Sequence, residues 1–202
     1  MGDTEGLHES EVDPDPVVQF GRWYADLPEG PDRSAATLAT ASAEGEPSAR
    51  IVLLRGFDDR GFVFFTNHHS AKAADLAANP RAALVFSWPP ARQVRLAGRV
   101  EHLTRDESLD YWRGRPRGAQ LAAWASWQSE VIESREVLER RWAEFNDRFP
   151  AGEDVPLPDF WGGYRVIPEW MEFWHQREYR LHDRLRYRRT TDGAWAVERL
   201  SP

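Results

Sequence analysis

The sequence predicts a mainly β, α+β fold in which a small antiparallel β-barrel carries packed helices. Three observations lead to this prediction. Short apolar segments, separated by turn sequences, follow one another between residues 37 and 101. Apart from one short helix they do not alternate with helices, as the strands of a parallel sheet do. Helical segments are collected between residues 104 and 149 instead, and strands return after residue 163.

The chain has 202 residues, of which 41% are hydrophobic and 29% are charged, as expected for one compact domain. No segment approaches the roughly 20 apolar residues of a membrane-spanning helix, and no signal peptide is visible. Cysteine is absent, which excludes disulfides and thiolate chemistry. The formal charge of −7 argues against nucleic-acid binding. We therefore expect a cytoplasmic protein without a membrane or nucleic-acid partner.

Charge is distributed unevenly along the chain. Residues 1–15 carry six acidic side chains and no Lys or Arg, whereas residues 175–190 carry six arginines. An acidic segment in which apolar residues follow no helical or strand repeat is typical of disorder. The sequence therefore predicts a disordered acidic tail over residues 1–14 and a single domain over residues 15–202.

The first part of this domain begins with a helix, which Asp15-Pro16 can open and which extends to Leu27. Turn sequences at residues 44–47 and 58–61 then separate extended segments. The predicted strands cover residues 37–43, 49–56 and 62–66.

In the rest of the domain, cap and turn residues mark the element ends. Ser70 can cap a short helix, and Thr104 with Glu107 forms a capping-box sequence. A Thr-Asp-Gly sequence at 191–193 predicts a turn between late strands. The predicted elements are helices over residues 71–78, 104–114, 119–126 and 134–149, a hairpin of 82–88 with 93–101, and strands within 163–200.

Several common site motifs are missing. The sequence contains no GxGxxG, GxxxxGK[ST], GxSxG or HExxH pattern, so nothing indicates a Rossmann site, a P-loop, a serine-hydrolase elbow or a zincin. His68-His69 is the closest histidine pair, but adjacent residues point in different directions and a shared metal is not expected. We predict no metal site.

Two segments in the first half place cations where an anion could bind. Arg50 and Arg55 flank an apolar strand on opposite faces, and they are either exposed strand ends or contacts to anions. Lys72 is the only lysine and follows Ser70 at a helix start, where free N–H groups favour phosphate. Many ordinary helices begin in this way, so this site is a hypothesis.

Two further segments combine polar and aromatic residues. Tyr111 and Arg115 meet on a helical path, and Pro116 should free Arg115 to reach outward. The pair could hold a phosphate or form a solvated helix end. Gln128 and Ser129 stand beside tryptophans, where they could contact the edge of a planar heterocycle or end a core helix.

The last polar segment holds Arg180, His182 and Arg184. On a strand these three side chains share one face. They would repel one another unless an anion or an electron-rich ligand lay among them. We therefore favour a ligand site over simple packing here.

Together these segments closely resemble the pyridoxine/pyridoxamine 5′-phosphate oxidase family over residues 15–202. Any one match would be weak, but many matches in the same order make the resemblance specific. The matching segments are RIVLLR (50–55), FFTN (64–67), SAK (70–72), NPR (79–81), RQV (92–94), RPRGAQ (115–120), WQS (127–129), PLPDFWGGYR (156–165), EFW (172–174) and RLHDRLRY (180–187).

The resemblance implies an FMN-binding split β-barrel, antiparallel and Greek-key-like, in a homodimer with FMN at the subunit interface. It implies oxidation of pyridoxamine or pyridoxine 5′-phosphate to pyridoxal 5′-phosphate with O2 as acceptor, giving H2O2. Family FMN contacts map onto Arg50, Ile51, Val52, Leu53, Leu54, Arg55, Phe65, Thr66, Lys72, Gln93, Gln128, Ser129, Trp174 and Arg184. Substrate contacts map onto Arg55, Tyr111, Arg115, Arg180 and His182, of which Arg180 and His182 are the candidate catalytic residues.

The side chains suit these roles. Lys72 and its helix start suit the FMN phosphate. A cation near the flavin N1 raises the reduction potential, and Arg50 and Arg184 are the candidates. Arg180 and His182 would orient the substrate, because orientation and charge should matter more than a dedicated base.

The sequence also departs from the family. Arg55 replaces a common lysine, Ala71 replaces a basic residue at the FMN phosphate, and Ala119 replaces a serine at the substrate phosphate. Arg177 and Tyr179 differ just before the RLHDR segment. The basic, aromatic N-terminal arm that closes over the substrate in many members is replaced by an acidic segment.

These departures keep two alternatives open. A related FMN oxidase of secondary metabolism would act on a dihydrophenazine-type or other reduced heterocycle, and its phosphate site should decay. A flavin-binding protein without this oxidase activity would lose the substrate contacts. Arg55, Tyr111 and Arg115 all persist, which favours the phosphorylated vitamer.

Overall fold

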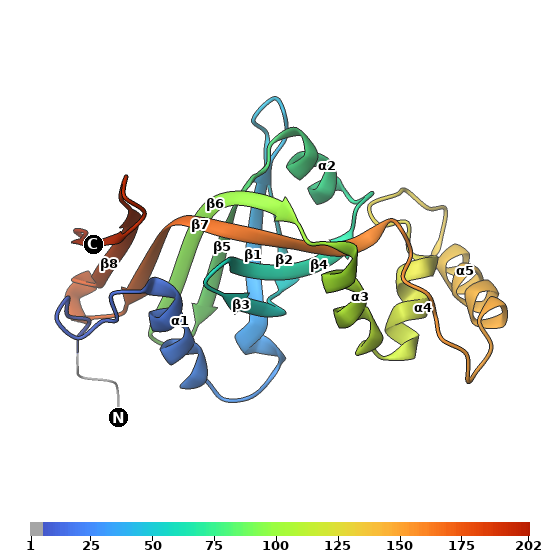
Figure 1. The fold of residues 1–202 in the computed structure, drawn as a ribbon, viewed down its shortest axis with the longest axis horizontal. Coiled ribbons are helices and arrows are strands. Elements are labelled where there is room, and N and C mark those ends of the chain that lie inside the picture. The colour runs from blue at the N-terminus through green and yellow to red at the C-terminus, as the bar shows by residue number, and fades with distance from the viewer. Residues whose placement is uncertain (1–5) are drawn as a thin grey trace.

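One curled antiparallel sheet forms the centre of the molecule (Figure 1). The computed structural model describes residues 6–202, and within them the sheet has nine strands in the order β2-β1-β5-β6-β7-β4-β3, with β8 on β7 and β9 on β8. The predicted mainly β, antiparallel fold is confirmed. The strands are β1 (Ala35–Ala41), β2 (Pro47–Leu53), β3 (Gly56–Asp58), β4 (Gly61–Asn67), β5 (Arg81–Trp88), β6 (Arg92–His102), β7 (Trp161–His175), β8 (Asp183–Arg189) and β9 (Trp195–Arg199).

Helices surround this sheet. The first begins as predicted, because the Asp15 carboxylate accepts the Val17 N–H at 2.8 Å, and it buries Phe20 and Trp23. The α-helices of the described residues are α1 (Pro16–Ala25), α2 (Ala71–Ala78), α3 (Arg105–Arg113), α4 (Arg117–Ala125) and α5 (Arg135–Arg148), and short 3-10 turns cover Pro31–Ser34 and Glu178–Arg180.

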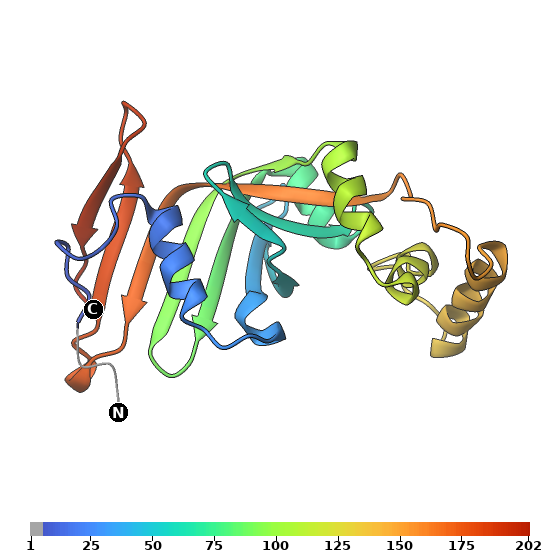
Figure 2. The same cartoon turned by 60° about the horizontal axis from the view of Figure 1, so that its bottom comes forward.

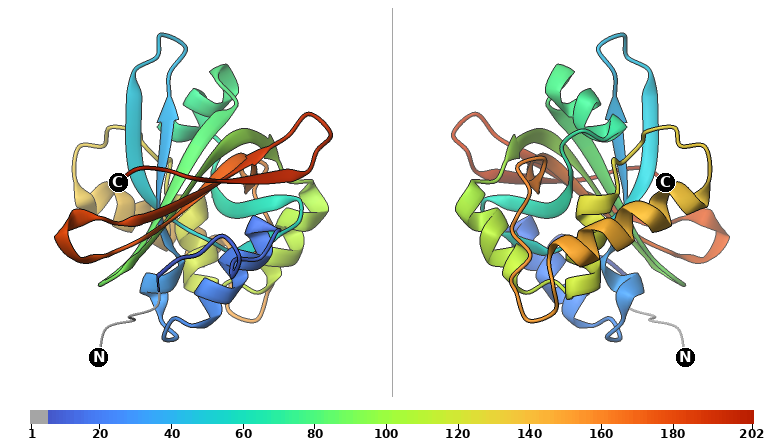
Figure 3. Two further views of the ribbon diagram at one scale, coloured as in Figure 1. Left: turned by 90° about the vertical axis from the view of Figure 1, so that its left-hand side faces the viewer. Right: turned by 90° about the vertical axis from the view of Figure 1, so that its right-hand side faces the viewer.

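The long strand β7 connects the two ends of the molecule. Its first part, 161–166, pairs with β4, its last part, 170–175, pairs with β8, and β6 pairs along most of its length. Helices α3, α4 and α5 gather at one end of β7, and the β8–β9 hairpin lies at the other (Figures 1 and 2). Figure 3 shows these two ends in turn, with the hairpin facing the viewer on the left and α5 on the right.

Aromatic side chains fill the main core. The ring of Phe20 packs edge-on against Phe62 and Phe86, at centroid distances of 4.9 and 5.0 Å. A second, smaller core surrounds Trp112 and Trp161 beneath α3 and α4. The helical end of β7 therefore has its own packed support.

Residues 6–14 lie against the C-terminal strands. Arg199 of β9 donates to the Leu7 carbonyl and to the Glu9 carboxylate, at 2.7 and 2.8 Å. This packing differs from the disorder predicted for residues 1–14, because Glu9 pairs with Arg199 of the C-terminal hairpin and the Asp13 carbonyl accepts the Tyr187 hydroxyl. The first five residues lie outside the described part of the chain.

The outer face of the sheet is smooth over β1, β5 and β6. Ala39, Ala83 and Ala97 stand opposite one another in register and line a shallow groove. On the edge strand β2, the side chains of Ile51 and Leu53 remain exposed. Exposed large apolar side chains beside a strand face of small residues are typical of an interaction face.

Candidate active site

A cavity of about 250 Å³ lies where β2, β4 and α2 meet the junction of α3 and α4. Its lining comes from segments far apart in the sequence, all of which the sequence predicts to share one site. The lining residues are Ile51, Val52, Leu53, Arg55, Phe65, Thr66, Lys72, Tyr111, Arg115 and Gln128. The lining holds three cations and no carboxylate, which is a composition suited to anions.

Lys72 is a buried cation, 8% exposed. Its Nζ lies 2.8 Å from Gln128 Oε1, 3.0 Å from Thr66 Oγ1 and 3.1 Å from Ser70 Oγ. Burial, with a smaller contribution from the charge of Arg50, lowers the pKa of Lys72 to about 8. All three hydrogen-bond partners are neutral, so an anion beside Lys72 would stabilise its charged form.

The N-terminus of α2 adjoins this lysine. Ser70 occupies the predicted N-cap position, but its hydroxyl donates to the Asn67 carbonyl at 2.7 Å and does not cap the helix. The Ala71 N–H donates to Ser129 Oγ at 3.1 Å. Ser129 adopts a φ of 76°, a conformation that costs energy for a residue other than glycine and recurs at functional sites. Ser129 therefore stands at the positive end of the helix dipole.

Arg115 is a second, half-buried cation of the cavity. Its guanidinium carbon lies 4.6 Å from the ring centroid of Trp161, and its Nη2 donates to the Ala119 carbonyl at 3.0 Å. Its Nε is buried and has no hydrogen-bond partner among residues 6–202. Burial lowers the pKa of Arg115. The prediction that Pro116 directs this side chain outward is wrong, because the guanidinium turns inward over the indole.

Three parallel rings, which we call the aromatic column, adjoin the cavity, and two of them, Phe65 and Tyr111, line it. Phe65 stacks on Tyr111 with centroids 4.0 Å apart and on Trp161 with centroids 5.3 Å apart, both at interplanar angles of 10°. Arg55 lies beside the same column, with its guanidinium carbon 6.0 Å from the Tyr111 ring. The rings therefore help to fix Arg55 and Arg115 on one wall.

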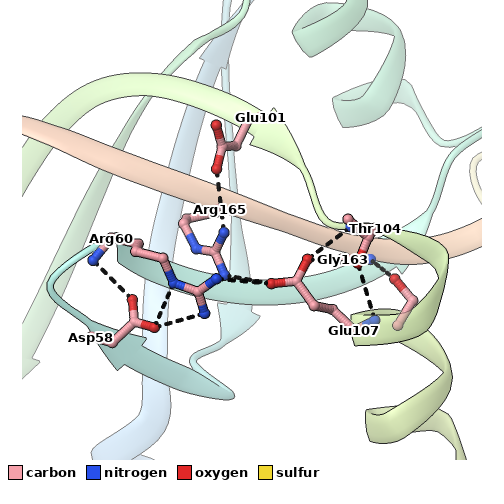
Figure 4. A network of polar contacts seen from close by, with 8 residues as sticks. Asp58, Arg60, Glu101, Thr104, Glu107, Gly163 and Arg165 are labelled. Carbon is pink, nitrogen blue, oxygen red and sulfur yellow. Dashed lines mark hydrogen bonds and ion pairs between the residues drawn. The ribbon is translucent and has the colours of Figure 1, made fainter.

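An ion-pair network around Arg165 holds α3 in place (Figure 4). The Arg165 side chain is 7% exposed and donates to Glu107 at 3.0 Å and Glu101 at 3.3 Å. The other carboxylate oxygen of Glu107 accepts the Thr104 N–H at 2.9 Å, and Thr104 Oγ1 accepts the Glu107 N–H at 3.2 Å, as the predicted capping box requires. The Thr104 backbone hydrogen bond and the Arg165 contact lower the pKa of Glu107 to about 2. The network thereby fixes the helix that carries Tyr111.

Two predicted cofactor residues of the first segment lie outside the cavity lining. Leu54 is buried in the main core. Arg50 donates to Thr40 Oγ1 and lies 3.7 Å from the Asp75 carboxylate. Arg50 is therefore held by contacts within its own chain.

A second group of predicted residues lies at the other end of β7. Gln93, Trp174 and Arg184 are register partners across β6, β7 and β8. The Trp174 ring lies 4.6 Å from the His182 ring, centroid to centroid. Arg184 is paired with Glu172, with its Nε 2.9 Å and its Nη2 3.2 Å from the two carboxylate oxygens.

The expectation that Arg180, His182 and Arg184 share one face of a single strand is wrong. Glu178–Arg180 form a 3-10 turn in which Tyr179 and Arg180 have φ values of 55° and 65°, and β8 starts only after His182. This left-handed turn breaks the two-residue period. His182 Nδ1 accepts the Arg177 N–H at 3.1 Å, which orients the imidazole.

The two groups are far apart within one chain. Trp161 adjoins the cavity and Trp174 belongs to the second group, and they occupy opposite ends of β7, about 40 Å apart along an extended strand. The ribbon views agree with this separation (Figures 1 and 2). One small molecule therefore cannot contact both groups of the same chain.

Comparison with known proteins identifies the family. Residues 27–149 match the pyridoxamine 5′-phosphate oxidase family, and residues 161–202 match the pyridoxine 5′-phosphate oxidase C-terminal dimerisation region. The chain belongs to the pyridoxamine 5′-phosphate oxidase family. The resemblance, the split-barrel fold and the oxidoreductase class predicted from the sequence are thereby confirmed.

Relatives of the family match over nearly their whole length. Proteins named pyridoxine/pyridoxamine 5′-phosphate oxidase are 52% identical in Cupriavidus pinatubonensis (97% of this chain, 93% of the relative) and 53% identical in Nostoc punctiforme (98% and 94%). The crystal structure of PhzG from Burkholderia lata, in complex with tetrahydrophenazine-1-carboxylic acid, is 31% identical, with a TM-score of 0.90 over 100% of both chains. A pyridoxamine 5′-phosphate oxidase-related, FMN binding protein from Nostoc punctiforme shares the fold at 20% identity and a TM-score of 0.68, over 84% of this chain and 88% of that one.

Two site residues of this family member are missed by the sequence analysis. Trp161 and Glu172 lie inside matched segments, but neither is predicted as a contact. Strand parity could have found Glu172, because it shares the sheet face of Trp174. No comparable pattern indicates that Trp161 stacks under Arg115, since α3 and β7 meet only in the tertiary fold.

No helix in the described part of this family member is long and apolar enough to cross a membrane.

Proposed function

We propose that this protein oxidises pyridoxamine 5′-phosphate and pyridoxine 5′-phosphate to pyridoxal 5′-phosphate, with O2 as the electron acceptor and H2O2 as product. The cofactor is FMN, as in the family to which the chain belongs. The observation that carries the proposal is the cavity in which Arg55, Lys72 and Arg115 have no carboxylate partner among residues 6–202. FMN and the vitamer each bring a phosphate, so the site must hold two anions.

The first anion site suits the FMN phosphate. Lys72 supplies the charge, the first turn of α2 supplies N–H donors, and Gln128 and Ser129 supply polar side chains beside them. The lowered pKa of Lys72 follows from burial without a counter-ion, so binding of a phosphate would stabilise the charged lysine.

The second anion site suits the substrate phosphate. Arg115 and Arg55 supply charge, and Tyr111 supplies a hydroxyl on the same wall. The Nε of Arg115 is buried without a hydrogen-bond partner in the described residues, so the guanidinium is not saturated by its own chain and retains capacity for a ligand anion. Arg115 and Lys72 line one cavity, which supports the binding of both phosphates in the same site.

A second copy of the chain completes the site. The Trp174 group cannot reach the cavity of its own chain, whereas a two-fold dimer can bring it to the cavity of the other copy. The smooth outer face around Ala39 and Ala83 and the exposed Ile51 on β2 offer the apolar surface that such a dimer buries. The match of residues 161–202 to a dimerisation region supports the same arrangement.

The residues of this chain bind and orient the substrate. Bound FMN supplies the redox chemistry by taking two electrons from the substrate and passing them to O2. Arg180 and His182 of one copy hold the vitamer ring at the cavity of the other, with C4′ toward the flavin. The Arg177 N–H bond to Nδ1 leaves Nε2 of His182 as the N–H donor when the imidazole is neutral. For the amine substrate, water then releases ammonia from the oxidised C4′–N group.

A second candidate function is oxidation of a reduced phenazine-type heterocycle. The full-length similarity to PhzG, at a TM-score of 0.90, favours this alternative. A carboxylate on such a substrate could pair with Arg115 in place of a phosphate. The aromatic column of Phe65, Tyr111 and Trp161 suits either planar ligand.

The test is anaerobic reduction of the bound flavin. The FMN-loaded protein is mixed with pyridoxamine 5′-phosphate, and the flavin absorbance is followed before and after air is admitted. Bleaching, followed by pyridoxal 5′-phosphate and peroxide in air, is the expected result. Pyridoxamine without the phosphate is the matched control and should bleach the flavin much more slowly. A flavin that stays oxidised with both phosphorylated vitamers, yet bleaches with a dihydrophenazine carboxylate, would establish the alternative.

A cytoplasmic location is part of the same proposal.

A further inference from the structure

A buried carboxylate lies beside the proposed flavin contacts of the second group. Glu172 of β7 is 1% exposed and stands between Arg95 of β6 and Arg184 of β8. Arg95 Nη2 lies 2.6 Å from Glu172 Oε2, and Arg184 donates to both carboxylate oxygens. Although burial alone would raise it, these hydrogen bonds lower the pKa of Glu172. Glu172 is therefore a shared anion between two arginines.

Arg184 is fixed on more than one side. Its Nη1 donates to the Ser201 carbonyl at 2.9 Å, and its own carbonyl accepts the Leu200 N–H at 2.9 Å. Glu172 and Ser201 occupy three of the five N–H donors of the guanidinium, which leaves two without a partner in the described chain. The group is thus held in one orientation with donors to spare for a ligand.

The register partners of Arg184 on the sheet indicate FMN as that ligand. Gln93, Trp174 and Arg184 are register partners on β6, β7 and β8, and all three are proposed FMN contacts. Arg95 and Glu172 are register partners in the next row on the same sheet face. A charge change at Glu172 therefore acts next to the flavin position through the guanidinium it holds.

We propose that Glu172 is a positioning residue that fixes Arg184 against the flavin and sets the positive charge that Arg184 presents to it. This inference rests on the proposed function, because it takes Arg184 to be an FMN contact. The reduced flavin carries negative charge near N1, so a cation there favours the reduced state. Glu172 offsets part of that cationic charge, and Arg95 in turn offsets part of the charge of Glu172.

Two variants should shift the flavin in opposite directions. Glu172→Gln removes the anion but keeps an oxygen acceptor for Arg184, so the bound flavin becomes easier to reduce. Arg95→Gln removes the cation that offsets part of the Glu172 charge. Glu172 then offsets more of the Arg184 charge, so the bound flavin becomes harder to reduce. General damage to the fold would not produce opposite signs. Arg95 is partly exposed, so its variant tests the inference even if the buried Glu172→Gln fails to fold.

The matched control lies on the same sheet face. Glu198 of β9 pairs with Arg186 at 2.7 Å in the same kind of cross-strand ion pair, but it makes no contact with Arg184. Glu198→Gln should leave the flavin potential unchanged. The readout is the ratio of the dissociation constants for oxidised and reduced FMN, measured by titration, which does not depend on turnover.

We expect each of the two variants to change this ratio by about tenfold, which is about 30 mV for a two-electron couple. In an Arg184→Met background, Glu172→Gln should change the ratio much less. If the wild-type protein binds FMN and oxidises a vitamer but both variants match Glu198→Gln, the function stands and the inference is overturned. Equal effects with and without Arg184 would also overturn it. If the wild-type protein binds no FMN, the proposed function itself fails and the inference with it.

Discussion

Arg115 holds its guanidinium carbon 4.6 Å above the ring of Trp161, in a cavity that supplies it with no carboxylate. A cation stacked on an indole keeps its orientation while its edge N–H donors stay available. The contact joins the loop after α3 to the first residue of β7. It therefore anchors the guanidinium proposed to bind the substrate phosphate on the most extensively paired strand of the sheet.

Removal of the Arg115 charge should weaken binding of phosphorylated substrate. Arg115→Ala is expected to raise KM for pyridoxamine 5′-phosphate by about tenfold or more, because a charge-assisted contact is lost. Steady-state kinetics on the FMN-loaded protein measure this. Arg113→Ala is the matched control, since Arg113 is the exposed last residue of α3, two positions before Arg115, and within residues 6–202 its ion pair is with Asp110. An unchanged KM for the Arg115 variant would refute the phosphate-site assignment.

Trp161 should act on the substrate through Arg115. Trp161→Leu is expected to raise KM by about three- to tenfold, because the cation–π contact disappears, while FMN affinity stays near the wild-type value. Trp161→Phe retains an aromatic face and should recover most of the loss. A variant that loses FMN and substrate affinity together would show a general packing defect of the smaller core instead.

FMN binding should weaken at alkaline pH because of Lys72. Its pKa of about 8 in the ligand-free protein means that the amine loses its charge above that pH, whereas the phosphate of bound FMN favours the charged form. The dissociation constant should therefore rise by up to about tenfold per pH unit above pH 8. Fluorescence titration between pH 6 and 10 measures this. Lys72→Arg keeps its charge throughout this range, so its profile should be flat, and a wild-type profile equally flat would contradict the assignment.

Acid should destabilise the α3 anchor through Glu107. Its folded pKa of about 2 lies below the ordinary value of 4.5, so its stabilising contribution is complete above about pH 4.5 and is lost as pH falls toward 2. Glu107→Gln should lower the free energy of unfolding at pH 7 by about 0.5–1 kcal/mol. Between pH 4.5 and pH 2, the free energy of unfolding of this variant should fall less than that of the wild-type protein. Urea unfolding at several pH values measures both. Glu139→Gln, in an exposed pair with Arg135 on α5, should behave like wild type.

His182 should affect turnover and not cofactor retention. His182→Ala is expected to lower kcat by about tenfold or more, because the substrate loses an orienting contact, while bound FMN co-purifies in the wild-type amount. Flavin content and kcat measured on the same preparation separate the two effects. Loss of FMN from this variant would place His182 against the cofactor.

Local patterns in the sequence predicted most of the fold. The helix over residues 71–78 and the Thr104–Glu107 capping box occur as expected, because cap residues and apolar periodicity act over a few residues. The segment around Tyr179 and Arg180 was assigned wrongly to a strand. Two consecutive positive φ values there are a tertiary outcome that residue types alone do not indicate.

The candidate site was predicted in composition but not in arrangement. Ten of the predicted residues line one cavity, since the family motifs preserve residue types. The separation of the Trp174 group from that cavity follows from the length of β7, which extends through Trp161–His175. The packing of residues 6–14 depends on Arg199, a partner far away in the sequence. The composition of the segment does not reveal this partner and therefore favours disorder.

The extent of β7 has a consequence for mixed assemblies. In the proposed dimer, each site combines the cavity of one copy with the Trp174 end of the other. A chain carrying Arg115→Ala and a chain carrying His182→Ala are each defective in a pure dimer. When they associate with each other, one site collects both substitutions and the other contains neither. Two impaired preparations, unfolded together, refolded as a mixture and assayed at low substrate concentration, should thus gain activity by subunit complementation, at up to about half the wild-type level for each hybrid dimer.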